Sequence, residues 1–230
     1  MKKSLITISV ILLASCAQAE PKEPEAEGTP FTNEEVGFSL IVPEGVELLS
    51  ADHLVPSSTG SIALTVRVDD VSELEEAGLY SKQSAEEVIK NLEKGELGPG
   101  LDFEEEKSEK IVSLGTLNAR EGMIFGRFEV CDVTFERILV FYPKKDDKTY
   151  QVVINLSMPN EKMIPAFPDY FHKDADNCGD ELVWIQQAET GENMRIFSKF
   201  HHYEVQTNEH SLIKEWNETF EEIKGGIKFN

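Results

Sequence analysis

An acidic segment before residue 181 carries side chains that could bind a hard cation. Asp174, Asp176 and Asp180 stand in "DADNCGD". Calcium prefers several converging carboxylate oxygens with little positive charge nearby. Two positions depart from a calcium loop, because Cys178 replaces an oxygen ligand and Ile185 stands where the bidentate glutamate belongs. We therefore interpret the segment as a solvated acidic loop, with a Ca²⁺ site in a secreted calcium-binding protein as the alternative.

Other residues with catalytic or metal-binding chemistry lack a supporting pattern. His172 and the pair His201-His202 could bind a transition metal, but no cysteine or carboxylate has suitable spacing to them. The chain contains no G-x-S-x-G, H-E-x-x-H or C-x-x-C motif. We expect no catalytic residue, no required cofactor and no enzymatic activity. A hydrolase that uses scattered carboxylates or a metal is the alternative.

The chemistry of Cys16 depends on how the N-terminus is processed. Two lysines precede the apolar run Leu5–Ala14, which is too short to span a bilayer and is typical of a signal peptide. The residues Leu13-Ala14-Ser15-Cys16 resemble the bacterial lipobox, in which the cysteine becomes the lipidated N-terminus. Residues 1–15 are then a lipoprotein signal peptide, and the protein is exported and anchored by lipid.

Ordinary signal peptidase offers a second interpretation of the same leader. Ala17-Gln18-Ala19 fits its small-x-small rule, and cleavage before Glu20 would release a soluble secreted protein without Cys16. If Cys16 is lipidated, Ala17 stands where an aspartate would favour retention in the inner membrane. By resemblance to lipoproteins, this predicts the outer membrane, facing the periplasm.

Residues 16–30 are predicted to form an acidic, proline-rich tether. The stretch "EPKEPEAEGTP" holds three prolines, four glutamates and no large apolar residue. Such a segment cannot bury enough surface to fold by itself. It would hold a single folded domain, residues 31–230, away from the membrane.

The charge of the chain excludes some classes of partner. It has 22 basic and 43 acidic residues, a net charge of −21. Loss of residues 1–19 would remove two lysines and no acids, leaving a net charge of −23. A surface this negative repels nucleic acid and anionic headgroups, so we expect no nucleic-acid binding. We expect a monomer that binds a protein partner in the envelope.

Cys131 and Cys178 are left as a pair if Cys16 is lipidated or removed. An even number of cysteines in an oxidising compartment suggests a disulfide. Two buried free thiols are an equally acceptable interpretation of the same sequence.

The apolar pattern predicts an α+β fold, an antiparallel sheet flanked by helices. Ser84 starts a capping box and opens one helix, which "GELGPG" ends. Short links between successive strands predict antiparallel pairing. A second helix, residues 211–224, has the apolar stripe Leu212, Trp216, Phe220 and Ile223. The predicted strands are residues 37–42, 62–68, 110–114, 119–130, 133–142, 150–157 and, at the end, 227–229.

Three stretches resemble one superfamily. They are "GFSLIVPEGVEL", "SAEEVIKNL" and "WNETFEEIKGGIKF". They are similar to the opening strand and turn, the first long helix, and the closing helix and strand of proteins related to the photosystem II protein PsbP and the import factor Mog. The resemblance implies an α/β/α sandwich. It also implies a non-catalytic protein that docks to other proteins, and it assigns no functional residue.

Residues 158–206 are predicted to be an insertion into that fold. The segments "ELVWIQQAET" and "NMRIFSKFHHYEV" could pair as a hairpin. Within the loop 163–171, Phe167, Tyr170 and Phe171 could form the contact surface for the partner, since aromatic residues dominate interface hot spots. Alternatively, these rings fold back and cover an open sheet face.

Overall fold

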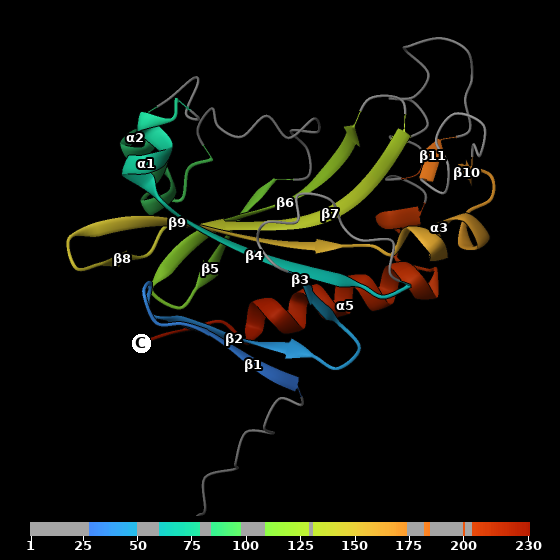
Figure 1. Ribbon diagram of the computed structural model, residues 1–230, viewed down its shortest axis with the longest axis horizontal. Helices are drawn as coiled ribbons and strands as arrows, with labels where there is room; N and C mark the ends of the chain where they lie inside the picture. The colour runs from blue at the N-terminus through green and yellow to red at the C-terminus, as the bar shows by residue number, and fades with distance from the viewer. Residues whose placement is uncertain are drawn as a thin grey trace, which may run out of the picture.

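A computed structural model describes most of the domain that follows the tether. The described residues are 28–49, 60–78, 84–97, 109–128, 131–173, 182–184, 200 and 204–230. They form a mixed α+β fold that is mostly sheet, with few helices (Figure 1). Among them, no helix is both long enough and apolar enough to cross a membrane. The predicted fold class is confirmed at this level.

The large sheet contains most of the predicted strands. Its strand order is β3-β4-β9-β7-β6-β5, with β8 paired to β9. All pairs are antiparallel except β3 with β4. The parallel pair was not predicted, because β3 is only three residues long and has no alternating pattern. The strands are β3 (Glu47–Leu49), β4 (Ala63–Asp70), β5 (Lys110–Leu114), β6 (Leu117–Phe128), β7 (Cys131–Phe141), β8 (Lys144–Lys145) and β9 (Lys148–Ser157).

A small sheet and the C-terminal helix cover one face of the large sheet. The small sheet has the order β1-β2-β12, from β1 (Gly28–Asn33), β2 (Phe38–Pro43) and β12 (Lys228–Phe229). Helix α5 (Ser211–Gly225) lies beside it under the large sheet (Figure 1). The predicted stripe of α5 is buried, and Trp216 Nε1 donates a hydrogen bond of 3.0 Å to the Leu156 carbonyl. Burial of each such side chain contributes about 1.5–3 kcal/mol, so this stripe holds α5 on the sheet.

Two short helices cover part of the opposite face. Helix α1 (Val71–Glu76) and helix α2 (Ala85–Glu93) pack with Ile138, Val140 and Tyr142 in a second, smaller core. Ser84 is the N-cap of α2, as predicted, and its hydroxyl accepts a hydrogen bond of 3.3 Å from the Glu87 N–H. Gly95 has φ +76°, a conformation that favours glycine and ends the helix.

The N-terminal boundary differs from the prediction. The last three residues of the predicted tether, 28–30, belong to β1, which pairs with β2 over its full length. The Phe31 ring packs on Phe38 with the centroids 5.9 Å apart. Strand β1 was missed because Thr29 and Pro30 continue the polar composition of the tether, and only pairing with β2 makes this segment a strand.

The predicted insertion begins with regular structure where a loop was expected. It contains helix α3 (Asn160–Ala166), strand β10 (Phe171–Lys173) and strand β11 (Leu182–Trp184). Strand β11 pairs with β10 in antiparallel fashion, with Phe171 opposite Trp184. The predicted hairpin partner, the segment "NMRIFSKFHHYEV", lies largely outside the described residues, so the hairpin stays a prediction.

Candidate functional site

Most of the predicted site residues lie outside the described residues. These are Cys16, Cys178 and the three acidic candidates for a Ca²⁺ site, Asp174, Asp176 and Asp180. Cys131 is the first residue of β7, but its predicted disulfide partner is not described. The lipid anchor, the disulfide and the calcium site all stay predictions. Within the described ranges, no three histidine, cysteine or acidic residues cluster as metal ligands.

The predicted contact aromatics lie mainly in the core. Phe167 is 4% exposed and Phe171 is 1% exposed. The Phe167 ring lies 5.0 Å from the Phe200 ring, and the Phe171 ring lies 5.8 Å from Phe135. The prediction that these two residues form an exposed contact surface is wrong, because the rings cover the sheet, as the alternative stated. Tyr170 is half-buried, and its hydroxyl lies 3.4 Å from Glu204 Oε1.

A half-open pocket of about 240 Å³ lies where five chain segments meet at one end of the large sheet. The segments are the β1–β2 turn, the end of α2, the β5–β6 turn, the β7–β8 link and β12. The first and last segments are joined, because the Asn230 N–H donates a hydrogen bond of 2.8 Å to the Gly37 carbonyl. The pocket thus lies where the small sheet, the large sheet and α2 come together.

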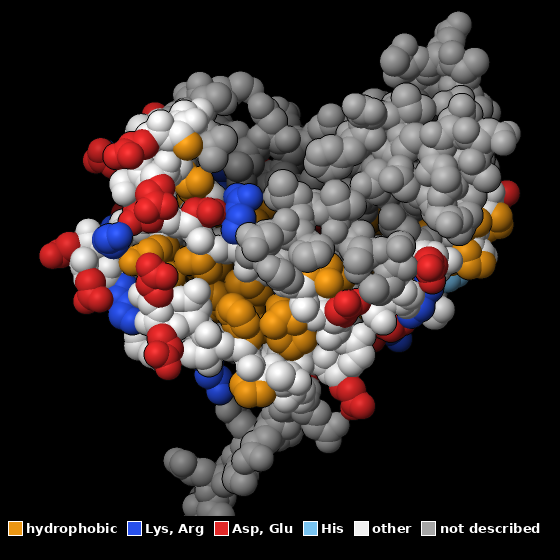
Figure 2. Space-filling model, viewed as in Figure 1, with side chains coloured by type: hydrophobic (Ala, Val, Ile, Leu, Met, Phe, Trp, Pro, Cys, Tyr) orange, Lys and Arg blue, Asp and Glu red, His pale blue; other side chains and the backbone are white. Residues whose placement is uncertain are grey.

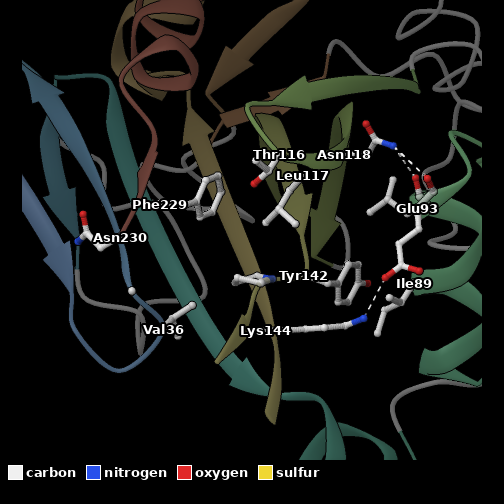
Figure 3. A pocket seen from close by; sticks show the side chains of 13 residues that line it. Val36, Ile89, Glu93, Thr116, Leu117, Asn118, Tyr142, Lys144, Phe229 and Asn230 are labelled. Carbon is white, nitrogen blue, oxygen red and sulfur yellow. Dashed lines mark hydrogen bonds and ion pairs between the residues drawn. The ribbon is translucent and has the colours of Figure 1, made fainter. Parts of the chain in front are cut away.

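The floor of this pocket is apolar. In Figure 3, Phe229, Leu117 and Tyr142 approach the same space from three different segments, with Ile89 of α2 on its far side. The Phe229 ring is held by an edge-to-face contact with Phe141, with centroids 5.7 Å apart. These side chains exclude water from the floor and offer contact area to an apolar group.

The rim of the pocket is polar. Lys144 Nζ lies 2.9 Å from Glu93 Oε1, and both side chains are more than half exposed. Asn118 Nδ2 donates a hydrogen bond of 2.9 Å to the Leu92 carbonyl and so connects β6 to the end of α2 (Figure 3). Among the described residues that line the pocket there is no histidine, cysteine or aspartate. The described lining therefore offers shape and apolar surface, with polar groups confined to the rim.

A second hollow, an open groove of about 640 Å³, lies beside a buried carboxylate. The Glu121 side chain is 2% exposed and contacts Lys110, Arg137 and Lys224 at 2.9, 2.5 and 2.8 Å. Burial opposes ionisation of Glu121, but hydrogen bonds from Lys224 and Lys110 and the charge of Arg137 outweigh it, so its pKa is lowered.

This charge network binds elements of the fold to one another. Arg137 Nη1 also donates a hydrogen bond of 2.8 Å to Asn217 Oδ1 of α5, and its guanidinium carbon lies 4.2 Å from the Phe220 ring centroid. The cations are thus occupied by groups of the protein itself. Their main effect is to fix α5 against β6 and β7, and the apolar-floored pocket is the better candidate for binding.

Sequence reasoning did not find this pocket. Its lining residues come from five segments that are spread along the chain between Val36 and Asn230. No spacing along the chain brings these segments together.

Comparisons of the chain with protein-family models, with curated proteins and with solved structures gave no match.

Proposed function

We propose that the chain is a non-catalytic lipoprotein of the bacterial envelope that docks a protein partner. Lipid on Cys16 would anchor it, in the outer membrane facing the periplasm. The acidic tether before Gly28 would hold the domain away from the membrane. The lipobox residues Leu13-Ala14-Ser15-Cys16 and the short apolar run before them support the anchor.

The order of elements supports a PsbP-like form of this fold. A strand and turn open the domain, a capped helix precedes the antiparallel strands, and α5 with β12 closes it. This is the order that the sequence resemblance implies, and proteins of that superfamily mostly act by docking. The finer assignment to that superfamily is part of the proposal.

The observation that carries the docking function is the pocket between α2, the β5–β6 turn and β12. Pockets that enclose a whole small-molecule ligand usually measure roughly 300–1,000 Å³. At about 240 Å³, this pocket suits one protruding side chain of a partner better than a cofactor. Side chains that fill such pockets carry most of the binding energy in protein interfaces.

A site-specific crosslink tests this function. Thr116 is exposed on the pocket rim, and Lys214 is exposed on α5. A photo-crosslinking amino acid at position 116 should give one ultraviolet-dependent adduct in cells, identifiable by mass spectrometry. The same group at position 214 is the matched control and should not give it.

A change in the pocket completes the experiment. Ile89→Gln in the background of the position-116 crosslinker should remove the adduct while the folded protein persists. Equal adducts from positions 116 and 214, or an adduct that survives Ile89→Gln, would rule out docking at this pocket.

A further inference from the structure

We infer that the pocket at the end of α2 takes a large aromatic side chain from a basic segment of the partner. This inference rests on the proposed docking function and adds the chemistry of the occupant. It is drawn from the size of the pocket, the side chains of its floor and the charge around its mouth.

The size and floor favour an aromatic ring. The pocket of about 240 Å³ has room for one large side chain, and its lining includes the apolar residues Phe229, Leu117 and Ile89. Phe229 already makes an edge-to-face contact with Phe141 on one side. A ring from the partner could pack against Phe229 from the pocket side, and aromatic pairs add about 0.5–1.5 kcal/mol beyond the area that they bury.

The lysines near the pocket mouth are occupied by other groups. Lys144 pairs with Glu93, Lys145 donates a hydrogen bond to the Glu34 carbonyl, and Lys148 Nζ lies 2.8 Å from Asp70 Oδ2. The carboxylates of Glu93 and Asp70 neutralise Lys144 and Lys148, whereas the Glu34 carbonyl orients Lys145 and leaves its charge in place. Two of the three lysines are therefore poor partners for an acidic ligand.

Among the described residues, no cation pairs with the exposed carboxylates of two turns that flank the pocket segments. Glu34 and Glu35 stand in the β1–β2 turn, and Asp146 and Asp147 stand in the turn after β8. Figure 2 shows acidic side chains gathered over the end of the molecule that carries α1, α2 and β8. Lys94, Lys145 and Lys228 reduce the local excess of negative charge, but the whole chain has 43 acidic and 22 basic residues, and this excess keeps the field negative. That field attracts a basic segment and accelerates its association.

The inference can be tested by measuring the affinity of fluorescently labelled pentapeptides for the full lipidated protein in nanodiscs. Fluorescence anisotropy reports the binding, and empty nanodiscs are the blank. One peptide has a central tryptophan between pairs of lysines. The second replaces the tryptophan with alanine, and the third replaces the lysines with glutamates. The first should bind at least about tenfold more tightly than either of the others, since a tenfold difference in Kd is about 1.4 kcal/mol.

Variants show whether binding occurs in this pocket. Ile89→Gln should raise the Kd of the first peptide about tenfold, while Ile164→Gln should leave it unchanged. Ile164 is also a half-buried isoleucine on a helix, but it lies on α3 at the opposite end of the sheet (Figure 1). If Ile89→Gln lowers the melting temperature, Thr116→Lys provides the test instead. The added cation on the exposed rim should weaken binding of the lysine peptide without destabilising the fold.

Several results would overturn the inference. Equal affinity for the lysine and glutamate peptides would show that the partner segment need not be basic. Equal affinity for the tryptophan and alanine peptides would show that no aromatic side chain is bound. Displacement of the first peptide by decanoate, with tighter binding of decanoate itself, would make the pocket an acyl-chain site. If a partner still crosslinks to position 116 in these cases, docking stands and only the chemistry of the occupant fails.

Discussion

Lys110 and Glu121 lie directly opposite each other on β5 and β6, with Lys110 Nζ 2.9 Å from Glu121 Oε1. Next to this pair, Arg120 Nη2 of β6 lies 2.8 Å from Glu109 Oε2, in the residue that precedes β5. A slip of one residue would turn both pairs to the wrong faces. These two ion pairs therefore favour the observed register of the edge strand β5. Glu121 also connects this part of the sheet to α5 through its ion pair with Lys224.

Removal of the buried carboxylate should destabilise the domain. Glu121→Gln leaves Lys110, Arg137 and Lys224 close together without a counter-charge, and breaking a buried ion pair typically costs about 3–5 kcal/mol. Because Lys110 is more than half exposed, we expect a loss near the lower limit, about 3 kcal/mol in the free energy of unfolding measured with urea. The control Glu221→Gln alters a half-exposed carboxylate and should cost less than about 1 kcal/mol. Equal effects of the two variants would contradict a structural role for Glu121.

The same carboxylate should contribute to acid unfolding. The pKa of Glu121 is lowered in the folded protein from an ordinary value of 4.5, so its contribution is complete above about pH 4.5. As the pH falls through the lower folded pKa, the contribution is lost. The stability difference between the wild type and Glu121→Gln should thus be largest at neutral pH and shrink below pH 4.5.

Asp70 must be separated from this effect. Hydrogen bonds from Lys148 and Ser72 lower the pKa of Asp70 from 3.8 to about 2, so this residue also makes the wild type less stable in acid. Urea titrations of the wild type and Glu121→Gln across the acid range separate the effect of Glu121 from that of Asp70. Asp70 is present in both proteins, so its contribution cancels in the difference. A difference between them that stays constant down to pH 3 would show that Glu121 does not titrate in this way.

Phe167 should behave as a core residue. Its ring packs on Phe200 and lies 4.5 Å from the His210 ring, so Phe167→Ala should lower the free energy of unfolding by about 3–5 kcal/mol. Lys162→Ala, on the exposed side of the same helix, should change it by less than about 0.5 kcal/mol. A Phe167→Ala protein with an unchanged melting temperature would mean that the ring is not packed as described.

Cys16→Ser should move the protein from the membrane fraction to the soluble fraction. Lipid chains contribute about 0.8 kcal/mol per buried CH₂ group, so two or more chains give firm anchoring. Fractionation and immunoblotting of the two proteins measure the change. A soluble wild-type protein with Glu20 at its N-terminus would eliminate the lipid anchor.

A disulfide between Cys131 and Cys178 would close a loop with 46 residues between them. In the chain-entropy model such a bridge contributes roughly 4 kcal/mol. Intact mass after alkylation, with and without prior reduction, should show two protected cysteines in the oxidised protein. Alkylation of both without reduction would establish free thiols.

Local sequence determined much of this fold. The hydroxyl of Ser84 caps α2 through neighbouring residues, and the stripe of α5 from Leu212 to Ile223 has the spacing of one helical face. The strand of residues 110–114 was predicted with the bounds that the structure has, and the last strand, β12, begins within one residue of its prediction. These features depend on contacts within one helical turn or one strand, so their periodicity is visible in the sequence.

Tertiary structure decided the features that join distant segments. Thr29 and Pro30 form a strand because β2 pairs with them, and Phe167 is buried because Phe200 and His210 pack against it. Likewise, Glu121 meets Lys224 across 103 residues of chain, and the pocket joins Val36 to Phe229. Apolar burial and charge pairing act through space and leave no regular spacing along the chain, so only the folded protein shows where Phe229 and Ile89 form a site.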